Sequence, residues 1–121
     1  MTQEETRLLF VDLCARSPYG VKVTFAGHSG REDCILNSQH LNSTYSIEYL
    51  GLKPYLRSMS SMTDEESKEF ALLQTDFYID GFLYPIAAIN MINWLNSHHF
   101  DYCGLIERGL ALKAPEGMYN N

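Results

Sequence analysis

Apolar positions near the start of the chain recur at the spacing of a helix. They form one stripe, made of Thr6, Leu9, Phe10 and Leu13. This spacing predicts an amphipathic helix over residues 3–16. Thr2 and Glu5 have the spacing of a capping box, in which each side chain accepts a hydrogen bond from the other residue's backbone N–H. Pro18 ends the helix, because the residue before a proline avoids the α region.

Alternation of apolar and polar residues follows this helix and is typical of strands with one face in water. The pattern predicts three strands, over residues 21–26, 33–37 and 45–50. Their connections are short and polar, which favours an antiparallel meander. Residues 52–57 are interpreted as an irregular link that could hold a short edge strand, because Pro54 has no amide to donate to a central ladder.

The second half of the chain holds two longer helical patterns. Thr63 and Glu66 form another capping box, which predicts a helix over residues 63–74. A proline suits the first turn of the next helix, over residues 85–98. The aromatic segment 75–84 lies between them, and its Asp-Gly dipeptide could close a small hairpin or belong to a packed loop.

The pattern predicts two faces for the 85–98 helix. The inner side is formed by Ala88, Met91, Ile92 and Leu95, and the outer side by Asn90, Asn93 and Ser97. Asp101 is placed to cap a last short helix over 102–108, with Gly109 as its left-handed final residue. Residues 110–114 could add an edge strand, and 115–121 form a polar tail.

These elements predict one α+β domain over residues 1–121. Its expected order is an N-terminal helix, a three-stranded antiparallel meander with room for an extra edge strand, and two to three helices packed on one face. The chain has 121 residues, of which 45% are hydrophobic and 20% charged. This balance is typical of a globular domain that builds its own core.

The number and distribution of charged residues distinguish nucleic-acid partners from protein partners. The net charge is −6, and the 9 basic residues are scattered singly, whereas nucleic-acid binding depends on clustered Lys and Arg. Direct nucleic-acid binding is therefore not expected, and the acidic surface fits a protein partner. The sequence leaves the oligomeric state open.

Localisation follows from three further features. The N-terminus lacks a signal peptide, no apolar run reaches the roughly 20 residues of a membrane span, and the 3 cysteines contain no C-x-x-C pair. We therefore expect a cytoplasmic protein without membrane association and without a structural zinc site.

The densest cluster of chemically useful side chains contains His98, His99, Asp101 and Cys103. Metal ligands must converge on one point, and two histidines on a helix do so at a spacing of four residues rather than one. Histidines at a helix C-terminus and an aspartate cap explain the segment without chemistry. We assign no catalytic or metal-binding residue, and we expect no cofactor.

Aromatic residues beside an arginine are the usual material of protein-binding hot spots. Tyr55 and Arg57 lie in the predicted link, and Trp94 lies at the border between the two faces of its helix. These three residues are the candidate protein-binding site. A tryptophan in this position is also common in a core with its N–H satisfied.

Three segments carry a resemblance to a known family. They cover residues 13–21, 52–63 and 101–111, with Trp94-Leu95-Asn96-Ser97-His98-His99-Phe100 before the last. Together they resemble a family of small proteins of unassigned function that is frequent in gut Bacteroides-type genomes and in their phages and prophages. The resemblance implies an accessory protein of a mobile element that acts inside a bacterial cell. It implies no activity, ligand or site residue.

The function that these observations favour is a non-enzymatic protein-interaction module with an unidentified protein partner. One alternative is a small hydrolase or metal-dependent enzyme centred on residues 98–103, which requires their side chains to converge. The other is an acidic mimic of nucleic acid, which requires most of the 15 carboxylates to lie on one face.

Overall fold

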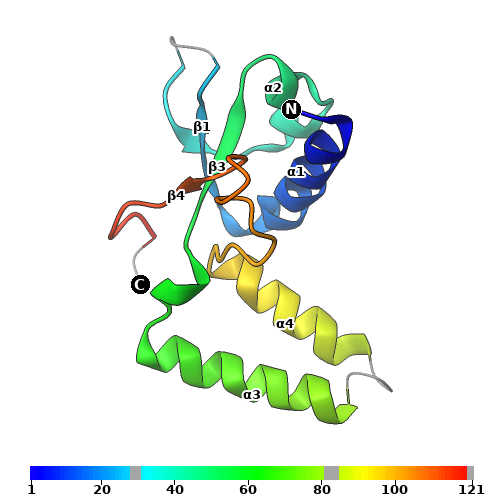
Figure 1. Cartoon of the computed structure of the whole chain (residues 1–121), viewed down its shortest axis with the longest axis vertical. Helices are drawn as coiled ribbons and strands as arrows, with labels where there is room; N and C mark the ends of the chain where they lie inside the picture. Colours follow the sequence, from blue (N-terminus) through cyan, green and yellow to red (C-terminus); the bar gives the residue numbers. More distant parts are fainter. Residues whose placement is uncertain (28–30, 81–84, 120–121) are drawn as a thin grey trace.

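The computed structural model describes residues 1–27, 31–80 and 85–119. In these residues four α-helices and a four-stranded mixed sheet form an α+β architecture (Figure 1). The helices are α1 (Gln3–Arg16), α2 (Tyr45–Glu48), α3 (Asp64–Asp80) and α4 (Pro85–Ser97). The strands are β1 (Lys22–Phe25), β2 (Cys34–Ile35), β3 (Leu52–Leu56) and β4 (Leu112–Lys113). The predicted class is confirmed.

The sheet has the order β2-β1-β3-β4, with β1 antiparallel to both of its neighbours and β4 parallel to β3. The predicted strands at 21–26 and 33–37 are present in shortened form. The predicted strand at 45–50 is wrong, because residues 45–48 form α2. Its turn buries Ile47 and exposes Tyr45 and Tyr49, which a strand would place on one face.

The third member of the antiparallel set is β3, in the segment predicted to be a link or an edge strand. Pro54 lies inside this central strand, opposite Val23. Ala26 donates its amide to the oxygen of Gly51 at 3.0 Å. Because hydrogen-bonded and non-hydrogen-bonded pairs alternate in an antiparallel ladder, Val23 and Pro54 form a non-hydrogen-bonded pair. Proline therefore costs the β1 ladder no hydrogen bond, which is why it is tolerated here.

The two backbones approach closely where β1 ends and β3 begins. Gly51 has a φ of +67°, and a Cβ there would lie 2.3 Å from the backbone nitrogen of Gly27. We expect Gly51→Ala to lower the free energy of unfolding by about 2–4 kcal/mol, from left-handed strain and overpacking together. Gly109→Ala is the matched control in urea unfolding, since Gly109 has a φ of +74° and open space around it. Its expected loss is about 1 kcal/mol, and equal losses would contradict the steric argument.

The hydrophobic core lies between the sheet, α1, α2 and the segment 105–111. It includes Leu9 and Leu13 of α1 with Val21, Val23 and Leu56 of the sheet region, all fully buried. The capping box that begins α1 is confirmed, with Glu5 N bonded to Thr2 Oγ1 and Thr2 N bonded to Glu5 Oε1. Local signals therefore place α1 correctly.

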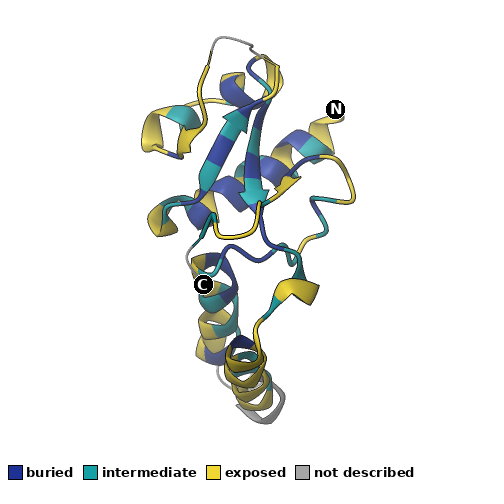
Figure 2. Cartoon of the chain, turned by 90° about the vertical axis from the view of Figure 1, so that its left-hand side faces the viewer, coloured by how far each residue is buried: buried dark blue, intermediate teal, exposed yellow. Residues whose placement is uncertain are grey.

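Helices α3 and α4 do not pack on the sheet face as predicted. They pack against each other as a helical hairpin that extends from one end of the molecule (Figure 1). Among the described residues, none between 58 and 97 belongs to the core cluster. Figure 2 shows the same division, with buried positions gathered in the sheet and α1 and exposed positions over most of the hairpin. None of the helices in the described residues has the length and apolar character needed to cross a membrane.

Helix α3 begins at the predicted capping box and continues to Asp80 instead of ending near residue 74. Residues 75–80 are therefore helical and form no hairpin strand, while Gly81 and the aromatics Phe82 and Tyr84 lie outside the described residues. The loop prediction for residues 28–30 also lies outside them. The predicted outer face of α4 is confirmed, with Asn90, Asn93 and Ser97 exposed. The predicted inner face is present only in part, because Leu95 is buried while Ala88, Met91 and Ile92 are half-buried.

The predicted helix at 102–108 is wrong, because residues 102–104 are irregular and residues 105–109 form a turn. Asp101 still caps them, and its two carboxylate oxygens accept from the amides of Leu105 and Ile106. Gly109 is left-handed as predicted. The edge strand predicted at 110–114 is present as β4, and Tyr119 in the tail donates its hydroxyl to the oxygen of Tyr55 at 2.7 Å.

Candidate functional site

Arg57 lies at the junction between the sheet and the helical hairpin, and it is 7% exposed. Its guanidinium makes a bidentate ion pair with Glu66, with N–O distances of 2.7 and 2.8 Å. The guanidinium carbon also lies 4.2 Å from the centre of the Phe100 ring. Its backbone N–H donates to the oxygen of His99, and its oxygen accepts from Asp101, both at 2.8 Å. Arg57 therefore joins β3, α3 and residues 98–101.

Glu66 is the acidic partner at the start of α3. One carboxylate oxygen accepts from the amide of Thr63 in the capping box, and the other lies 3.1 Å from His98 Nδ1. The hydrogen bonds from Arg57 hold the pKa of this carboxyl at about 2, well below its usual value of 4.5. The carboxylate is therefore ionised at neutral pH and is occupied by structural contacts.

Trp94 packs in a stack of rings beside this ion pair. Its ring centre lies 4.3 Å from that of His98, 5.6 Å from Phe70 and 5.8 Å from Phe100. Its indole N–H donates to Glu69 at 2.9 Å. The tryptophan is half-buried with its N–H satisfied, and it ties α3 to α4 outside the core cluster of the described residues.

Tyr55 lies apart from these two residues on β3. Its hydroxyl donates to Asp33 at 2.7 Å. A hydrogen bond from Thr24 and, to a lesser extent, this bond from Tyr55 lower the pKa of the Asp33 carboxyl. The structure therefore brings Arg57 and Trp94 into one cluster. Tyr55 lies in β3, two residues before Arg57, and its hydroxyl has a different partner. Arg57 is buried in this cluster and does not form an exposed hot spot with Tyr55.

The side chains of residues 98–103 have separate partners. His98 contacts Glu66, Asp101 caps the following turn, and Cys103 is exposed. His99 has a φ of +64° and stacks on Tyr119 at 3.8 Å. Burial lowers the pKa of His99 to about 4, so the ring is neutral at physiological pH. Within the described ranges, no group of three His, Cys, Asp or Glu could hold a metal ion.

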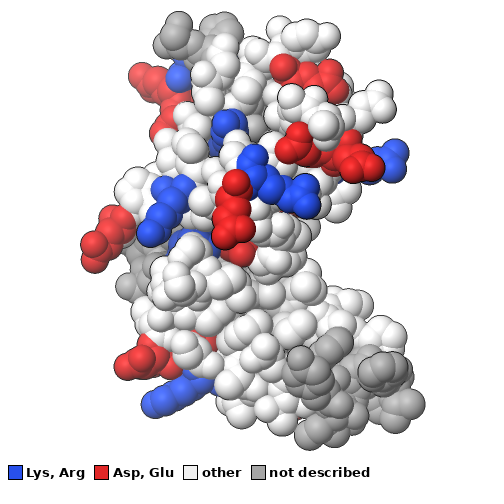
Figure 3. All heavy atoms as spheres, in the orientation of Figure 1, with Lys and Arg blue, Asp and Glu red and all other residues white. Residues whose placement is uncertain are grey.

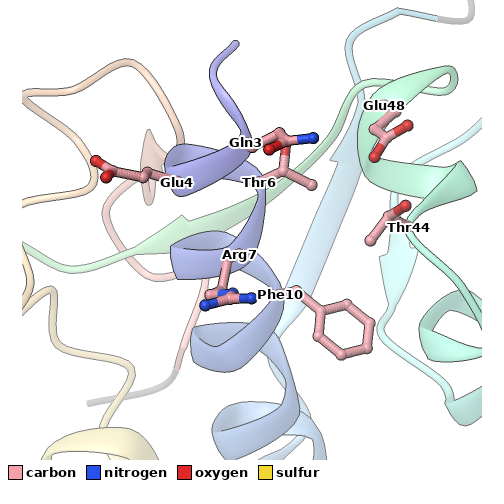
Figure 4. A pocket seen from close by; sticks show the side chains of 7 residues that line it. All are labelled: Gln3, Glu4, Thr6, Arg7, Phe10, Thr44 and Glu48. Atoms are coloured by element: carbon pink, nitrogen blue, oxygen red, sulfur yellow. The ribbon is translucent and has the colours of Figure 1, made fainter.

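Two of the open clefts on the surface of the described residues have volumes of about 510 Å³ each. One lies beside the ion pair and is lined by residues of the α3 start, by His98, His99 and by Tyr119. The other lies between α1 and the α2 segment, and Figure 4 shows its lining side chains, which include Glu4, Arg7 and Phe10. The cleft beside the ion pair also contains the hydroxyls of Thr63 and Ser97. The Ser97 hydroxyl donates to the oxygen of Trp94 and the Thr63 hydroxyl accepts from the amide of Glu66, so both are engaged by the backbone of their own helices.

The largest exposed apolar residues of the hairpin define a third feature, which we call the hairpin surface. It consists of Leu72 on α3 and of Ile86 and Ile89 on α4, with exposed fractions of 70%, 62% and 52%. On the face shown in Figure 3, charged atoms gather over the sheet half of the molecule and most of the hairpin is uncharged. The sequence prediction missed this surface.

A sequence signal for the hairpin surface exists. Residues 70–97 contain only two charged residues, Asp76 and Asp80, although the chain has 24 acidic and basic residues in all. The charges of α3 are concentrated in its first two turns, and α4 has none. A helix without charged residues is typical of one that is covered on more than one side. This contrast in charge along the sequence, rather than the positions of single aromatics, indicates where apolar residues are exposed.

Comparisons with protein-family models, with curated proteins and with solved structures returned no match. The geometry of the described residues is therefore the basis for assigning a function, and no match bears on the phage-associated family that the sequence resembles.

Proposed function

We propose that this chain is a non-enzymatic protein-interaction module whose contact surface is the hairpin surface of α3 and α4. The observation that carries the proposal is that the hairpin exposes apolar residues although it lies outside the core cluster. The two helices contribute nothing to the core cluster of the described residues, yet they expose Leu72, Ile86 and Ile89 to solvent. Contiguous patches of exposed apolar side chains are typical of surfaces that bind another protein, and the proposal is that these three residues belong to one such patch.

Helix energetics support the same proposal. Helices of 17 and 13 residues are marginal in water without tertiary packing. Helix α4 has no charged residue, so it gains nothing from ion pairs along its own surface. An apolar protein surface placed against the hairpin supplies the missing packing.

Charge supports this proposal over the acidic mimic. Asp12 and Glu66 are each paired with an arginine at low exposure, so neither is available to imitate a phosphate. On the face shown in Figure 3, acidic groups alternate with Lys and Arg. The resemblance to phage-associated proteins gives the proposal its setting, that of an accessory protein inside a bacterial cell.

Site-specific photo-crosslinking tests the proposed surface. A photoreactive phenylalanine analogue placed at Leu72 or Ile86 is expected to yield a protein adduct in cells of the source organism, because these side chains face the partner. The same analogue at Val11 is the matched control, since Val11 is also helical and is 60% exposed. Mass spectrometry of the adduct identifies the partner.

Either of two results would count against the proposal. The first is the absence of an adduct from both hairpin positions. The second is an adduct of equal yield from Val11, which would place the contact on α1 or make it non-specific.

A further inference from the structure

The outer face of α3 carries a self-complementary pattern of charge. Lys68, Leu72 and Asp76 are exposed and lie four residues apart, so they form one ridge along the helix. The apolar residue lies at the centre, with the basic residue one turn before it and the acidic residue one turn after it. The ion pairs within the described ranges involve neither Lys68 nor Asp76.

A second copy of the same helix, running in the opposite direction, complements this ridge. If the two helices cross at Leu72, the Lys68 of one copy meets the Asp76 of the other, and twofold symmetry repeats the pair. Ridges spaced by four residues are also those that interdigitate in the commonest helix-packing class, with axes crossing at about −50°. Closed twofold dimers use such self-complementary patches.

We propose that the occupant of the hairpin surface is a second copy of this chain, held by antiparallel contact of the two α3 helices across Leu72. This inference rests on the proposed function and names its partner. Each copy then supplies two helices, and the pair of hairpins forms a four-helix arrangement in which apolar residues are covered on more sides than in one hairpin.

Charge reversal tests the arrangement, with the molar mass of the purified protein measured by light scattering over a concentration series. The wild type is expected to be a dimer. Lys68→Asp and Asp76→Lys, each alone, are expected to weaken dimerisation on the order of 10-fold, because each places like charges opposite one another twice. The double variant carrying both changes restores complementary pairs and is expected to recover the wild-type dissociation constant.

A fourth variant addresses the centre of the contact. Leu72→Glu is expected to weaken dimerisation by about 100-fold or more, since it places two carboxylates side by side at the symmetry axis. Val11→Glu serves as the control and is expected to leave the dimer intact. Circular dichroism of each variant confirms that the helices are retained.

The outcomes separate this inference from the proposed function. A monomeric wild type that still gives adducts with another protein from Leu72 or Ile86 overturns the second copy as partner and leaves the hairpin as the contact surface. A monomer without such adducts overturns both. A dimer that survives Leu72→Glu, or a double variant no stronger than the single ones, overturns the antiparallel α3 contact.

Discussion

Replacing Arg57 by methionine is expected to lower the free energy of unfolding by about 3–5 kcal/mol at neutral pH, the usual cost of removing one partner of a buried ion pair. The methionine fills much of the volume but leaves the carboxylate of Glu66, 10% exposed, without its counter-charge. It also removes the donors that reach the oxygens of Ser61 and His98. Urea unfolding followed by circular dichroism measures the loss.

A second substitution separates the stability lost through the unpaired charge from the stability lost through poorer packing. Glu66→Gln in the Arg57→Met background removes the uncompensated charge and still allows the side chain to accept from the amide of Thr63. We expect this double variant to recover part of the lost stability. A double variant as unstable as Arg57→Met would show that the loss comes from packing alone.

The pH dependence follows from the pKa of Glu66, which is about 2 in the folded state and 4.5 as its ordinary value. A depressed carboxyl pKa stabilises the fold above pH 4.5, and this contribution is lost as the pH falls toward 2. It amounts to about 3 kcal/mol in the wild type. The difference between the wild type and Arg57→Met is therefore expected to shrink below pH 4.5.

The parts of the fold that follow from local signals could be predicted from the sequence. The capping boxes at Thr2 and Thr63 fix the starts of α1 and α3, because the hydrogen bonds concerned join residues three apart. The alternation of apolar and polar residues around Val23 is also a local signal, and it places β1 correctly. Gly109 is left-handed, as predicted for the last residue of a helix over 102–108, although that helix itself is absent.

The parts that depend on distant partners could not be predicted. Tyr45, Ile47 and Tyr49 alternate like a strand, yet the segment forms one helical turn, since short apolar runs fit either element. Pro54 argued against a central strand, but its position in the ladder depends on the register with β1. Neither fact is visible in the segment itself.

The candidate site shows the same limit. The prediction that Arg57 and Trp94 contact a partner stays a prediction, and the structure adds that each also has a hydrogen-bonding partner inside the chain. Leu72, Ile86 and Ile89 remain exposed, and their exposure depends on the position of the hairpin relative to the sheet. The hairpin leaves the sheet because its start is fixed by Glu66 on Arg57, a contact between elements that local patterns do not encode.

Arg16→Met is expected to lower the free energy of unfolding by about 3–5 kcal/mol at pH 7, because it too removes one partner of a buried ion pair. Arg16 is fully buried, with its Nε 2.7 Å from Asp12 and a terminal nitrogen 2.7 Å from the oxygen of Phe100. Without the arginine, Asp12 is a buried carboxylate with no counter-charge. Urea unfolding at pH 7 measures the expected loss.

The two arginine variants differ in the pH window of their effects. Burial already raises the pKa of Asp12 in the wild type, against the opposing effect of Arg16. In Arg16→Met that pKa rises further, so the folded state binds a proton before the unfolded state does, and stability is regained as the pH falls from 7 toward 5. Adding Asp12→Asn is expected to remove this dependence on pH and to restore part of the stability. If Arg16→Met loses the same free energy at pH 7 and pH 5, the carboxylate is not the source of the loss, and the hydrogen bond to Phe100 must account for the role of Arg16.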